Sequence, residues 1–372
     1  MIRLRPCAAA LLVLLSLTAC RGEAPTPDDP TEAAAVDAAA STDAAWIPAL
    51  DADAERIDAD MPGDFGVYVR HFGPSPGTLD RSDGRTWYLS STIKIPVAIA
   101  VLEQVDAGAL SLDQELVLAQ SDFVDGAGDM LSFKPGARFT IAALLEKSLR
   151  DSDSTATDML IRAVGEDHLN RRIREWAGPG FGPVTTILQV RYDAYGPVHP
   201  GVADLDNMAI VGLRNAPAGE ARLDALARAL GVPRSALDAE SLDAVFDAYY
   251  RGDRNQATLP AFATLLERLA AGELLSPDST ARMLGHMRSI STGDRRLSAG
   301  LPPGTDFAQK TGTQVRRACN VGIVDADAGR EGATVVLACA EDFDDLAQAE
   351  QAFQALGRAL GDTVLAASAS DG

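Results

Sequence analysis

Basic residues and histidines are scarce in this sequence. Its 372 residues include 33 Lys and Arg against 53 Asp and Glu, which gives a formal net charge of −20 at pH 7. Binding to a nucleic-acid backbone needs a basic surface, so we exclude a nucleic-acid partner. The four histidines do not have the spacing of metal ligands, since they lie scattered at His71, His168, His199 and His286. The sequence therefore predicts no metal site, and we expect no cofactor.

An apolar run long enough to span a membrane is missing from the N-terminal segment. The run over residues 8–17 follows Arg3 and Arg5 and is too short to serve comfortably as a permanent transmembrane helix. A short positive segment followed by a short apolar run is typical of a signal peptide. We therefore expect an exported protein.

The end of this run, Leu17-Thr18-Ala19-Cys20, resembles the cleavage box of bacterial lipoproteins. The resemblance implies a signal peptide over residues 1–19, a lipid on Cys20 and a protein anchored at the periplasmic face of a membrane. Arg21 rather than aspartate follows the cysteine, which in a diderm cell leaves the anchor free for the outer membrane. An ordinary secretory signal peptide is the alternative.

Side chains that could enter a core are few in residues 20–45, where Ala, Pro, Asp and Thr predominate. Such a composition is typical of a flexible tether. The whole chain is 47% apolar and 23% charged, which is the composition of a globular protein with a sizeable core. We therefore expect one folded domain over residues 46–366.

Strand-like segments occur near both ends of this domain, and helical patterns lie between them and after them. The strand-like segments are 64–72, 86–89, 307–313, 317–324 and 333–340. The helical patterns are 95–105, 140–149, 155–164, a hairpin within 199–256, and 346–360. The first of these is apolar almost all round and predicts a buried helix. The order predicts an α/β fold in which both ends of the chain build one sheet and an all-helical lobe is inserted.

A serine stands at the start of the predicted buried helix, one turn before a lysine. Because Ser91 and Lys94 are three residues apart, they share a face of that helix. The helix N-terminus favours negative charge beside Ser91, and a lysine among apolar neighbours can lose its proton and act as a base. Ser91 is therefore a candidate nucleophile, the alternative being a capping serine with a surface lysine.

Two further motifs carry hydroxyl and amine groups. Ser152-Asp153-Ser154 precedes a helix, where serine and aspartate could also form a plain N-cap. Lys310-Thr311-Gly312-Thr313 lies within a predicted strand. A glycine inside a strand is explained if a ligand must lie against the backbone at that position. The N–H of Thr313 could then donate to an oxyanion. A strand end beside a turn is the alternative.

Ser-x-x-Lys, Ser-Asp-Asn and Lys-Thr-Gly, in this order, are the motifs of class A β-lactamases and penicillin-binding proteins, and the chain resembles that family. Further similar stretches are 106–108, 155–158, 272–275 and 292–302. The resemblance covers residues 46–366 apart from an insertion at 199–256. It implies the β-lactamase/transpeptidase-like fold, an antiparallel sheet flanked by helices plus an all-helical lobe, with the active site between them.

The resemblance also implies how protons move. Ser91 would attack the carbonyl of a β-lactam amide and become acylated, while the N–H groups of Ser91 and Thr313 hold the oxyanion. Lys94 would take part in proton removal, and Ser152 would relay a proton to the leaving nitrogen.

Substrate binding would fall to the remaining motif residues. Lys310, as a point charge, and Thr311, through its hydroxyl, would hold the substrate carboxylate, and Asp153 would tie its loop together. Ser154 stands where the family usually has asparagine, so a shorter hydroxyl must serve the substrate side chain. The resemblance therefore leaves the substrate preference open.

The chain departs from the family where a glutamate should activate water for deacylation. Counting on from Val184-Thr185, its place falls at or near Arg191, and the family's Glu-x-x-Leu-Asn is absent. Asp193 is the nearest carboxylate and the candidate base, although a solvated surface acid is the alternative. The other candidates are Glu220, Glu240, Lys94, Tyr192 and Tyr195.

We therefore expect a serine β-lactamase-like hydrolase that contributes to β-lactam catabolism and resistance. Its substrate would be a small β-lactam or a peptidoglycan-like acyl compound, and the protein would be a monomer. Without a base for water the acyl-enzyme would persist, so the alternative is a penicillin-binding DD-peptidase or esterase-like hydrolase that deacylates slowly. A binding protein with a degenerate site is a third possibility, against which the intact Ser91, Lys94, Ser152 and Lys310 argue.

Four cysteines are present, of which Cys7 would leave with the signal and Cys20 would carry the lipid. If residues 317–324 and 333–340 form a hairpin, Cys319 and Cys339 lie nearly opposite each other, and export makes a disulfide permissible. Directly opposed cross-strand cysteines are geometrically strained, however. A disulfide and two buried thiols therefore stay equally open.

Overall fold

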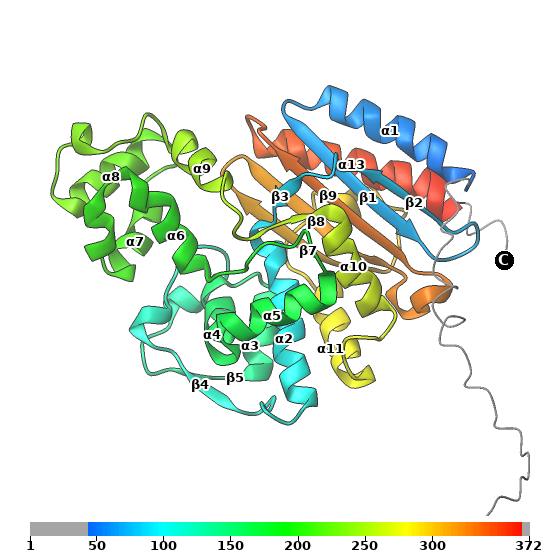
Figure 1. The fold of residues 1–372 in the computed structure, drawn as a ribbon, viewed down its shortest axis with the longest axis horizontal. Coiled ribbons are helices and arrows are strands. Elements are labelled where there is room, and N and C mark those ends of the chain that lie inside the picture. Colours follow the sequence, from blue (N-terminus) through cyan, green and yellow to red (C-terminus); the bar gives the residue numbers. More distant parts are fainter. Residues whose placement is uncertain (1–43, 367–372) are drawn as a thin grey trace, which may run out of the picture. The chain divides into compact units, whose positions relative to one another are not determined.

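The computed structural model describes residues 44–366, so the expected signal peptide, Cys20 and most of the expected tether lie outside the described residues. The described chain contains an antiparallel sheet of five strands, in the upper right part of Figure 1. In spatial order the strands are β2 (Gly77–Arg81), β1 (Asp64–His71), β9 (Thr334–Glu341), β8 (Arg317–Val324) and β7 (Phe307–Gln314). Both ends of the described chain therefore build one sheet, as the sequence predicted.

Helices cover both faces of this sheet. Successive residues of a strand point to opposite faces, and those of β9 accordingly belong to two different cores. Val336 packs with α1 (Trp46–Asp60) and α13 (Leu346–Leu360). Leu337 belongs to the core that contains α10 (Leu259–Ala270) on the other face. Because both faces are covered, β8 and β9 are buried along their whole length and show no polar alternation.

The all-helical lobe shares this second core and surrounds one largely apolar helix. That helix, α2 (Lys94–Asp106), is buried at every position from Lys94 to Leu102, as the apolar run over 95–105 predicted. The other helices of the lobe are α3 (Ile141–Leu149), α4 (Ser154–Val164), α5 (Glu166–Ala177) and α11 (Pro277–Arg288), and a ribbon of β4 (Glu115–Val117) and β5 (Arg138–Thr140) adjoins them. The Ser91 turn therefore rests on a well-packed base.

A second helical unit, which we call the α6–α9 lobe, has a core of its own. Leu223, Leu226 and Phe246 belong to this core. Its helices are α6 (Ile187–Tyr195), α7 (Asn207–Gly212), α8 (Glu220–Leu230) and α9 (Leu242–Tyr250). The chain then returns through β6 (Gln256–Thr258), which pairs with β3 (Thr86–Tyr88). Helices α8 and α9 form the predicted hairpin, whereas helix α6, at the place of the family's glutamate, was not predicted.

Strands β8 and β9 form the predicted hairpin, and Cys319 pairs directly with Cys339 across it. Their two sulfur atoms are joined as a disulfide, with both cysteines buried. Of the two possibilities that the sequence left open, the structure contains the bridge. It links strand β8, next to the motif-bearing β7, to the middle of the sheet.

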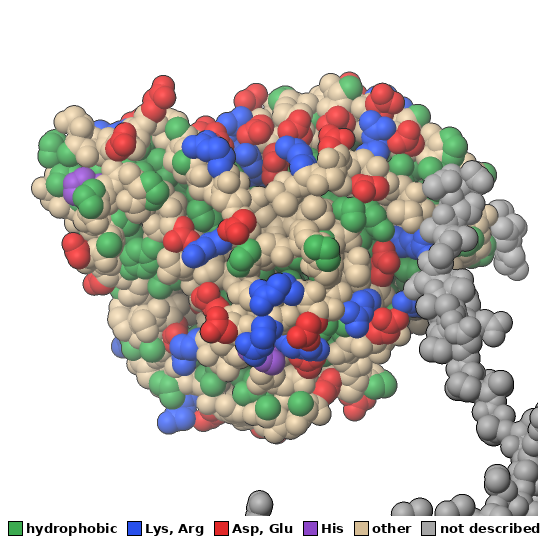
Figure 2. All heavy atoms as spheres, viewed as in Figure 1, with side chains coloured by type: hydrophobic (Ala, Val, Ile, Leu, Met, Phe, Trp, Pro, Cys, Tyr) green, Lys and Arg blue, Asp and Glu red, His purple; other side chains and the backbone are tan. Residues whose placement is uncertain are grey.

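Charged side chains of both signs are interspersed on the face shown in Figure 2, where neither sign gathers into one large patch. The described helices are short, and the longest, α1 and α13, have 15 residues each. A membrane span needs about 20 apolar residues. Between residues 44 and 366, no helix combines the length and the apolar character that a membrane crossing requires.

Candidate active site

Ser91 lies on a 3₁₀ turn, Ser90–Ile93, that leads directly into helix α2. The turn places the side-chain nitrogen of Lys94 3.0 Å from Ser91 Oγ. Ser91 is partly exposed and lines a cavity of about 500 Å³, whereas Lys94 is fully buried. The two residues that the sequence paired are therefore in hydrogen-bond contact.

The cavity is lined by residues from the sheet, the all-helical lobe and the α6–α9 lobe. Hydroxyl groups predominate among its polar side chains, and its cations are two arginines. The lining residues include Tyr88, Ser90, Ser91, Gly126, Ser152, Ser154, Ile187, Val190, Arg191, Arg296, Thr311 and Thr313. Among the described lining residues the carboxylates are Asp294 and Glu350, and Glu350 pairs with Arg295 at 3.1 Å.

Lys94 is buried without an ion pair to any carboxylate among residues 44–366. Burial lowers its pKa to about 7, although Asp153 and Asp158 favour the charged form, and Arg191 lowers the pKa further. The amine also donates to the Ser152 carbonyl oxygen at 2.5 Å and to Ser152 Oγ at 3.2 Å. A lysine in this state is partly neutral near pH 7 and can accept a proton from a neighbouring hydroxyl.

Ser152 lies between two lysines. Lys310 Nζ donates to Ser152 Oγ at 2.9 Å, and Lys94 Nζ donates to the same oxygen at 3.2 Å. Burial, and then the charges of Lys94 and Arg296, lower the pKa of Lys310 well below its usual range. Ser152 has a backbone φ of 55°, which few residues other than glycine adopt. The strained turn therefore places one hydroxyl where it can exchange protons with two amines.

Strand β7 passes against the Ser91 turn, and Gly312 is the residue at the contact. A Cβ atom at this position would lie 2.5 Å from the Leu89 carbonyl oxygen and 2.9 Å from the Ser91 nitrogen. The glycine is therefore required because the chain itself approaches here, where the sequence led us to expect a ligand. Thr313, the next residue, lines the same cavity as Ser91, so its N–H is a candidate donor to an oxyanion there.

Arg296, which the sequence did not single out, is the cation that lines the cavity beside strand β7. It is 4% exposed, and its Nη1 donates to the carbonyl oxygens of Gly312 at 2.8 Å and Cys319 at 2.7 Å. Its Nη2 donates to Thr313 Oγ1 at 2.5 Å. Burial lowers its pKa to about 10 against the attraction of Glu350, so it stays cationic at pH 7.

Arg296 makes no ion pair with a carboxylate among the described residues, which leaves its charge available to a ligand. Lys310, the expected carboxylate-binding cation, does not itself line the cavity and instead donates to Ser152 Oγ and to the Thr311 carbonyl oxygen. Nothing in the local pattern distinguishes Arg296 from its exposed neighbour Arg295. Its burial depends on β7 and β8, which follow later in the chain.

Asp153 caps helix α4 and holds the facing loop. Its carboxylate accepts hydrogen bonds from the backbone N–H groups of Ala156 at 2.8 Å and Met130 at 2.9 Å. This contact fits the structural role that the resemblance implied. A Cβ at Gly126 would lie 2.2 Å from Ser154 Oγ, so the loop packs directly on Ser154, which lines the cavity.

Helix α6 occupies the place where the resemblance put the glutamate that activates water. Its cap is Thr186, whose hydroxyl accepts from the Gln189 N–H at 3.1 Å. The buried Asp158 accepts from the backbone N–H groups of Ile187 at 2.8 Å and Leu188 at 2.9 Å. Burial raises the pKa of Asp158 to about 7, and these two hydrogen bonds counteract the rise. Three of the free N–H groups in the first turn of α6 are therefore held by side chains.

Arg191 occupies the position expected for the glutamate and lies one turn beyond Ile187. Both residues line the cavity together with Val190, since residues at this spacing share a face of a helix. The Nε of Arg191 donates to Asp125 Oδ1 at 2.6 Å. A cation, rather than a base, therefore stands in this part of the cavity wall.

Asp193, the predicted candidate base, lies on α6 but does not line the cavity. Its carboxylate accepts from Gln189 Nε2 and from Arg254 Nη1, each at 2.8 Å. The other candidates from the α6–α9 lobe do not line the cavity either, namely Glu220, Glu240, Tyr192 and Tyr195. Of the candidate bases that the sequence offered, Lys94 is the one in contact with Ser91.

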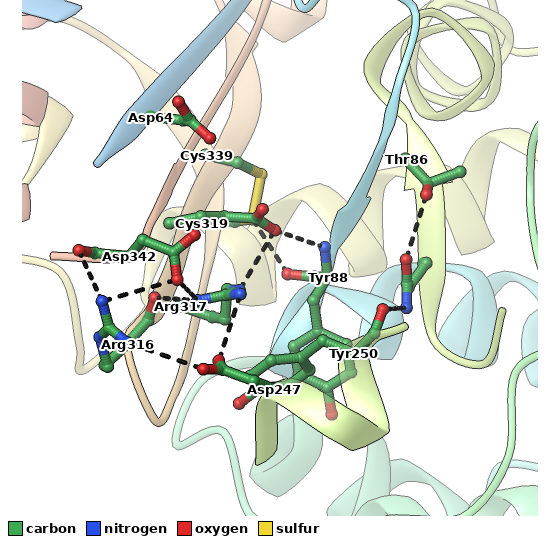
Figure 3. Close-up of polar contacts among 12 residues, drawn as sticks. Asp64, Thr86, Tyr88, Asp247, Tyr250, Arg316, Arg317, Cys319, Cys339 and Asp342 are labelled. Atoms are coloured by element: carbon green, nitrogen blue, oxygen red, sulfur yellow. Dashed lines mark hydrogen bonds and ion pairs between the residues drawn. A yellow bond between two sulfur atoms is a disulfide. The ribbon is translucent and has the colours of Figure 1, made fainter. Parts of the chain in front are cut away.

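The α6–α9 lobe is fastened to the turn between β7 and β8 (Figure 3). Asp247 on α9 lies 3.8 Å from Arg316 Nη1 and 3.6 Å from Arg317 Nη2. The Tyr250 hydroxyl donates to the Val315 carbonyl oxygen at 3.0 Å. The lobe and the motif-bearing strand therefore hold each other in place beside the cavity.

Tyr88 connects this fastening to the cavity that it lines. Its ring centroid lies 4.7 Å from that of Tyr250 and 5.8 Å from that of Tyr249. Burial raises the pKa of Tyr88 to about 12, so the phenol stays protonated near neutral pH and cannot act as a base there. The aromatic group therefore forms a wall of the cavity.

The sequence of this chain matches a known protein family and several of its members. A family model, the beta-lactamase enzyme family, matches residues 49–189 and 202–364. The matched ranges include most of the residues that we expected to be an insertion, and residues 190–201 are left out. A beta-lactamase from Mycobacterium tuberculosis is 27% identical over 259 residues, which are 69% of this chain and 65% of that protein. The match thus spans just under two thirds of that relative's length.

Solved structures with the same fold include a beta-lactamase and a penicillin-acylated mutant of PBP-A. A beta-lactamase from Sphaerobacter thermophilus matches with a TM-score of 0.62 at 25% identity, covering 86% of this chain and 98% of that one. A mutant of PBP-A, in an acyl-enzyme complex with penicillin-G, matches with a TM-score of 0.61 at 20% identity, covering 86% and 97%. These likenesses confirm the predicted fold.

Proposed function

This chain belongs to the beta-lactamase enzyme family, and on that basis we propose that it is a serine hydrolase that opens the amide of a β-lactam through an acyl-enzyme on Ser91. The observation that carries the proposal is the 3.0 Å contact between Lys94 Nζ and Ser91 Oγ at the cavity. A buried amine with a pKa of about 7 beside a partly exposed hydroxyl supplies what a serine nucleophile needs.

Acylation moves one proton from Ser91 to the leaving nitrogen. Neutral Lys94 takes the proton as Ser91 Oγ attacks the lactam carbonyl, and the N–H groups of Ser91 and Thr313 stabilise the oxyanion. Ser152 gives its hydroxyl proton to the ring nitrogen as the C–N bond breaks, and regains a proton from Lys94, 3.2 Å away. The products are an ester on Ser91 and an N–H on the opened ring, with Lys94 neutral again.

The substrate carboxylate lies at the β7 side of the cavity in this proposal. Arg296 supplies the charge there, and the hydroxyls of Thr311 and Thr313 supply hydrogen bonds. The acyl side chain then extends toward Ser154 and the loop that packs on it. Substrates with a free carboxylate next to the scissile amide are therefore favoured.

We assign deacylation to Lys94 as well. Arg191 cannot take a proton from water, and the acids considered in the α6–α9 lobe do not line the cavity. Lys94, neutral after acylation, takes a proton from water as the water oxygen attacks the ester carbonyl. It then gives that proton to Ser91 Oγ as the ester C–O bond breaks, which releases the opened acid and restores the Ser91 hydroxyl and the neutral Lys94. Because Lys94 is aligned on the serine oxygen, which carries the acyl group after the first step, we propose that deacylation is slower than acylation.

Arg191, paired with Asp125, stands where the family has the glutamate that activates water. The absence of a base at this place favours a second candidate function, that of a penicillin-binding protein whose acyl-enzyme persists. In that case the natural substrate is a peptidoglycan-like acyl compound and a β-lactam acts as an inhibitor. The chemistry on Ser91 is the same in both cases. The two functions differ in the rate at which the ester is hydrolysed.

We also propose that the protein is exported and carries a lipid on Cys20, on the support of the sequence Leu17-Thr18-Ala19-Cys20. Labelled palmitate fed to the producing cells should enter the wild-type protein and be lost with Cys20→Ser. Equal labelling of both proteins would contradict the anchor.

The nucleophile can be tested by intact mass after mixing the purified protein with benzylpenicillin. The wild type should gain the full mass of the penicillin, and Ser91→Ala should not. Ser90→Ala is the matched control, because Ser90 is the adjacent residue and also lines the cavity; it should still be labelled. Labelling of Ser91→Ala would sink the assignment.

A further inference from the structure

The cavity holds a cation on each of two different walls. Arg296 lies against β7 and donates to Thr313 Oγ1, on the side assigned above to the substrate carboxylate. Arg191 projects from α6 and pairs with Asp125, next to the glycine that packs on Ser154. The mechanism above uses Arg296 but gives Arg191 no partner from the substrate.

The guanidinium of Arg191 is only partly used by the protein. Among the described residues its hydrogen bond is the one from Nε to Asp125 Oδ1, at 2.6 Å. Its Nη1 is buried without a hydrogen-bond partner. An enclosed donor without a partner costs free energy, and a guanidinium presents five donors, of which Asp125 takes one. Nη1 of Arg191 therefore has no partner among the described residues, and the side chain that carries it lines the cavity.

The protein holds this side chain in a fixed place. Asp158 and the Thr186 cap secure the first turn of α6, as described above, and Arg191 follows one turn later on the cavity face. The ion pair with Asp125 fixes the side chain itself. A preorganised arginine loses little freedom on binding and is suited to planar anions such as carboxylates.

We propose that Arg191 is a specificity residue that binds a carboxylate on the acyl side chain of the substrate. This inference rests on the proposed function, since the acyl side chain is directed to the Ser154 wall only when Ser91 is acylated with the substrate carboxylate at Arg296. The substrate class is an acyl compound with two anionic groups, one on each side of the scissile amide.

The test compares two penicillins that differ by one carboxylate. Carbenicillin carries an additional carboxylate on the side-chain carbon where benzylpenicillin has hydrogen. The second-order rate constant for acylation of Ser91 is measured for each by competition with a fluorescent penicillin, and the ratio of the two constants is the readout. Partial misfolding lowers both constants together, so it leaves the ratio unchanged.

The wild type should prefer carbenicillin, and Arg191→Gln should lower the carbenicillin to benzylpenicillin ratio by about tenfold. Arg191→Lys should restore part of the preference. Arg254→Gln is the matched control, because Arg254 pairs with Asp193 on the same helix but does not line the cavity. Its ratio should equal that of the wild type.

If Arg191→Gln does not fold, Asp125→Asn tests the same contact from the other side. It removes the carboxylate that fixes Arg191 in place, so the ratio should fall. An unchanged ratio in the folded variants would overturn the inference while leaving the acylation of Ser91 intact. Failure of both penicillins to acylate the wild type would overturn the proposed function itself, and the inference with it.

Discussion

Lys94 Nζ lies 3.0 Å from Ser91 Oγ, and no carboxylate among residues 44–366 forms an ion pair with this amine. Burial therefore dominates its protonation and lowers its pKa to about 7 from the usual 10.5. Above that pH the neutral amine predominates and can accept the serine proton. Below it the amine is charged and the nucleophile is not activated.

The rate of acylation should consequently rise with pH and reach half of its maximum near pH 7. The measurement is the second-order rate constant for labelling by a fluorescent penicillin between pH 5.5 and 8.5. Lys94→Arg, which keeps a charge at every pH in this range, should be slower by at least about a hundredfold. A flat profile in the wild type would exclude Lys94 as the base.

Replacing Gly312 with alanine should destabilise the protein by about 2–4 kcal/mol, because the new methyl group overlaps the Leu89 carbonyl oxygen and the Ser91 nitrogen. Acylation should fall as well, since the turn that carries Ser91 must move. Gly285→Ala is the control, because a Cβ there, on helix α11, would meet no atom within 4 Å. That variant should be neutral or stabilised by up to about 1 kcal/mol. Similar urea midpoints for the two variants would contradict the close contact.

Arg296→Gln should raise KM for benzylpenicillin by about ten- to a hundredfold while changing kcat less, because the substrate carboxylate loses its charged partner. Arg296→Lys should not restore KM, since an ammonium group cannot hold the Gly312 and Cys319 carbonyl oxygens and the Thr313 hydroxyl as the fork does. Steady-state kinetics with the three proteins checks this. A fall in kcat at constant KM would place Arg296 outside the binding of the carboxylate.

The disulfide joins cysteines that are 20 residues apart in the sequence. Closing a loop of that length stabilises a folded chain by about 3 kcal/mol. The double variant Cys319→Ala, Cys339→Ala and the reduced wild type should both unfold at lower urea concentration than the oxidised wild type. Coinciding unfolding curves for all three would show that the bridge does not contribute.

Some elements could be predicted from the sequence because they are buried along most or all of their length, so that their residues form an unbroken apolar run. The strand over 317–324 is buried at every position and has the predicted bounds, and the apolar run over 95–105 is the interior of α2. Helix α1 was not predicted, because only Trp46, Leu50, Ala54 and Ile57 of its 15 residues are buried and acidic residues lie between them. Patterns of local burial thus show central elements better than peripheral ones.

The site could be predicted where short spacings fix the geometry. Ser91 and Lys94 meet because a turn brings residues three apart together. The partner of Arg191 could not be predicted, since Asp125 lies 66 positions earlier and reaches it only through the folding of α6. The same holds for Asp158, which holds the start of that helix from α4. Contacts of this kind depend on tertiary structure rather than on local pattern.

Nitrocefin turnover by the purified protein, followed by intact mass at intervals after mixing, tests the acyl-enzyme on Ser91 most directly. We expect an adduct on Ser91 that accumulates during turnover, because acylation is faster than the Lys94-dependent deacylation, and no adduct on Ser91→Ala. Steady colour without a detectable adduct would contradict slow deacylation. The absence of both colour and adduct would contradict the assignment of Ser91 as the nucleophile of a β-lactam hydrolase.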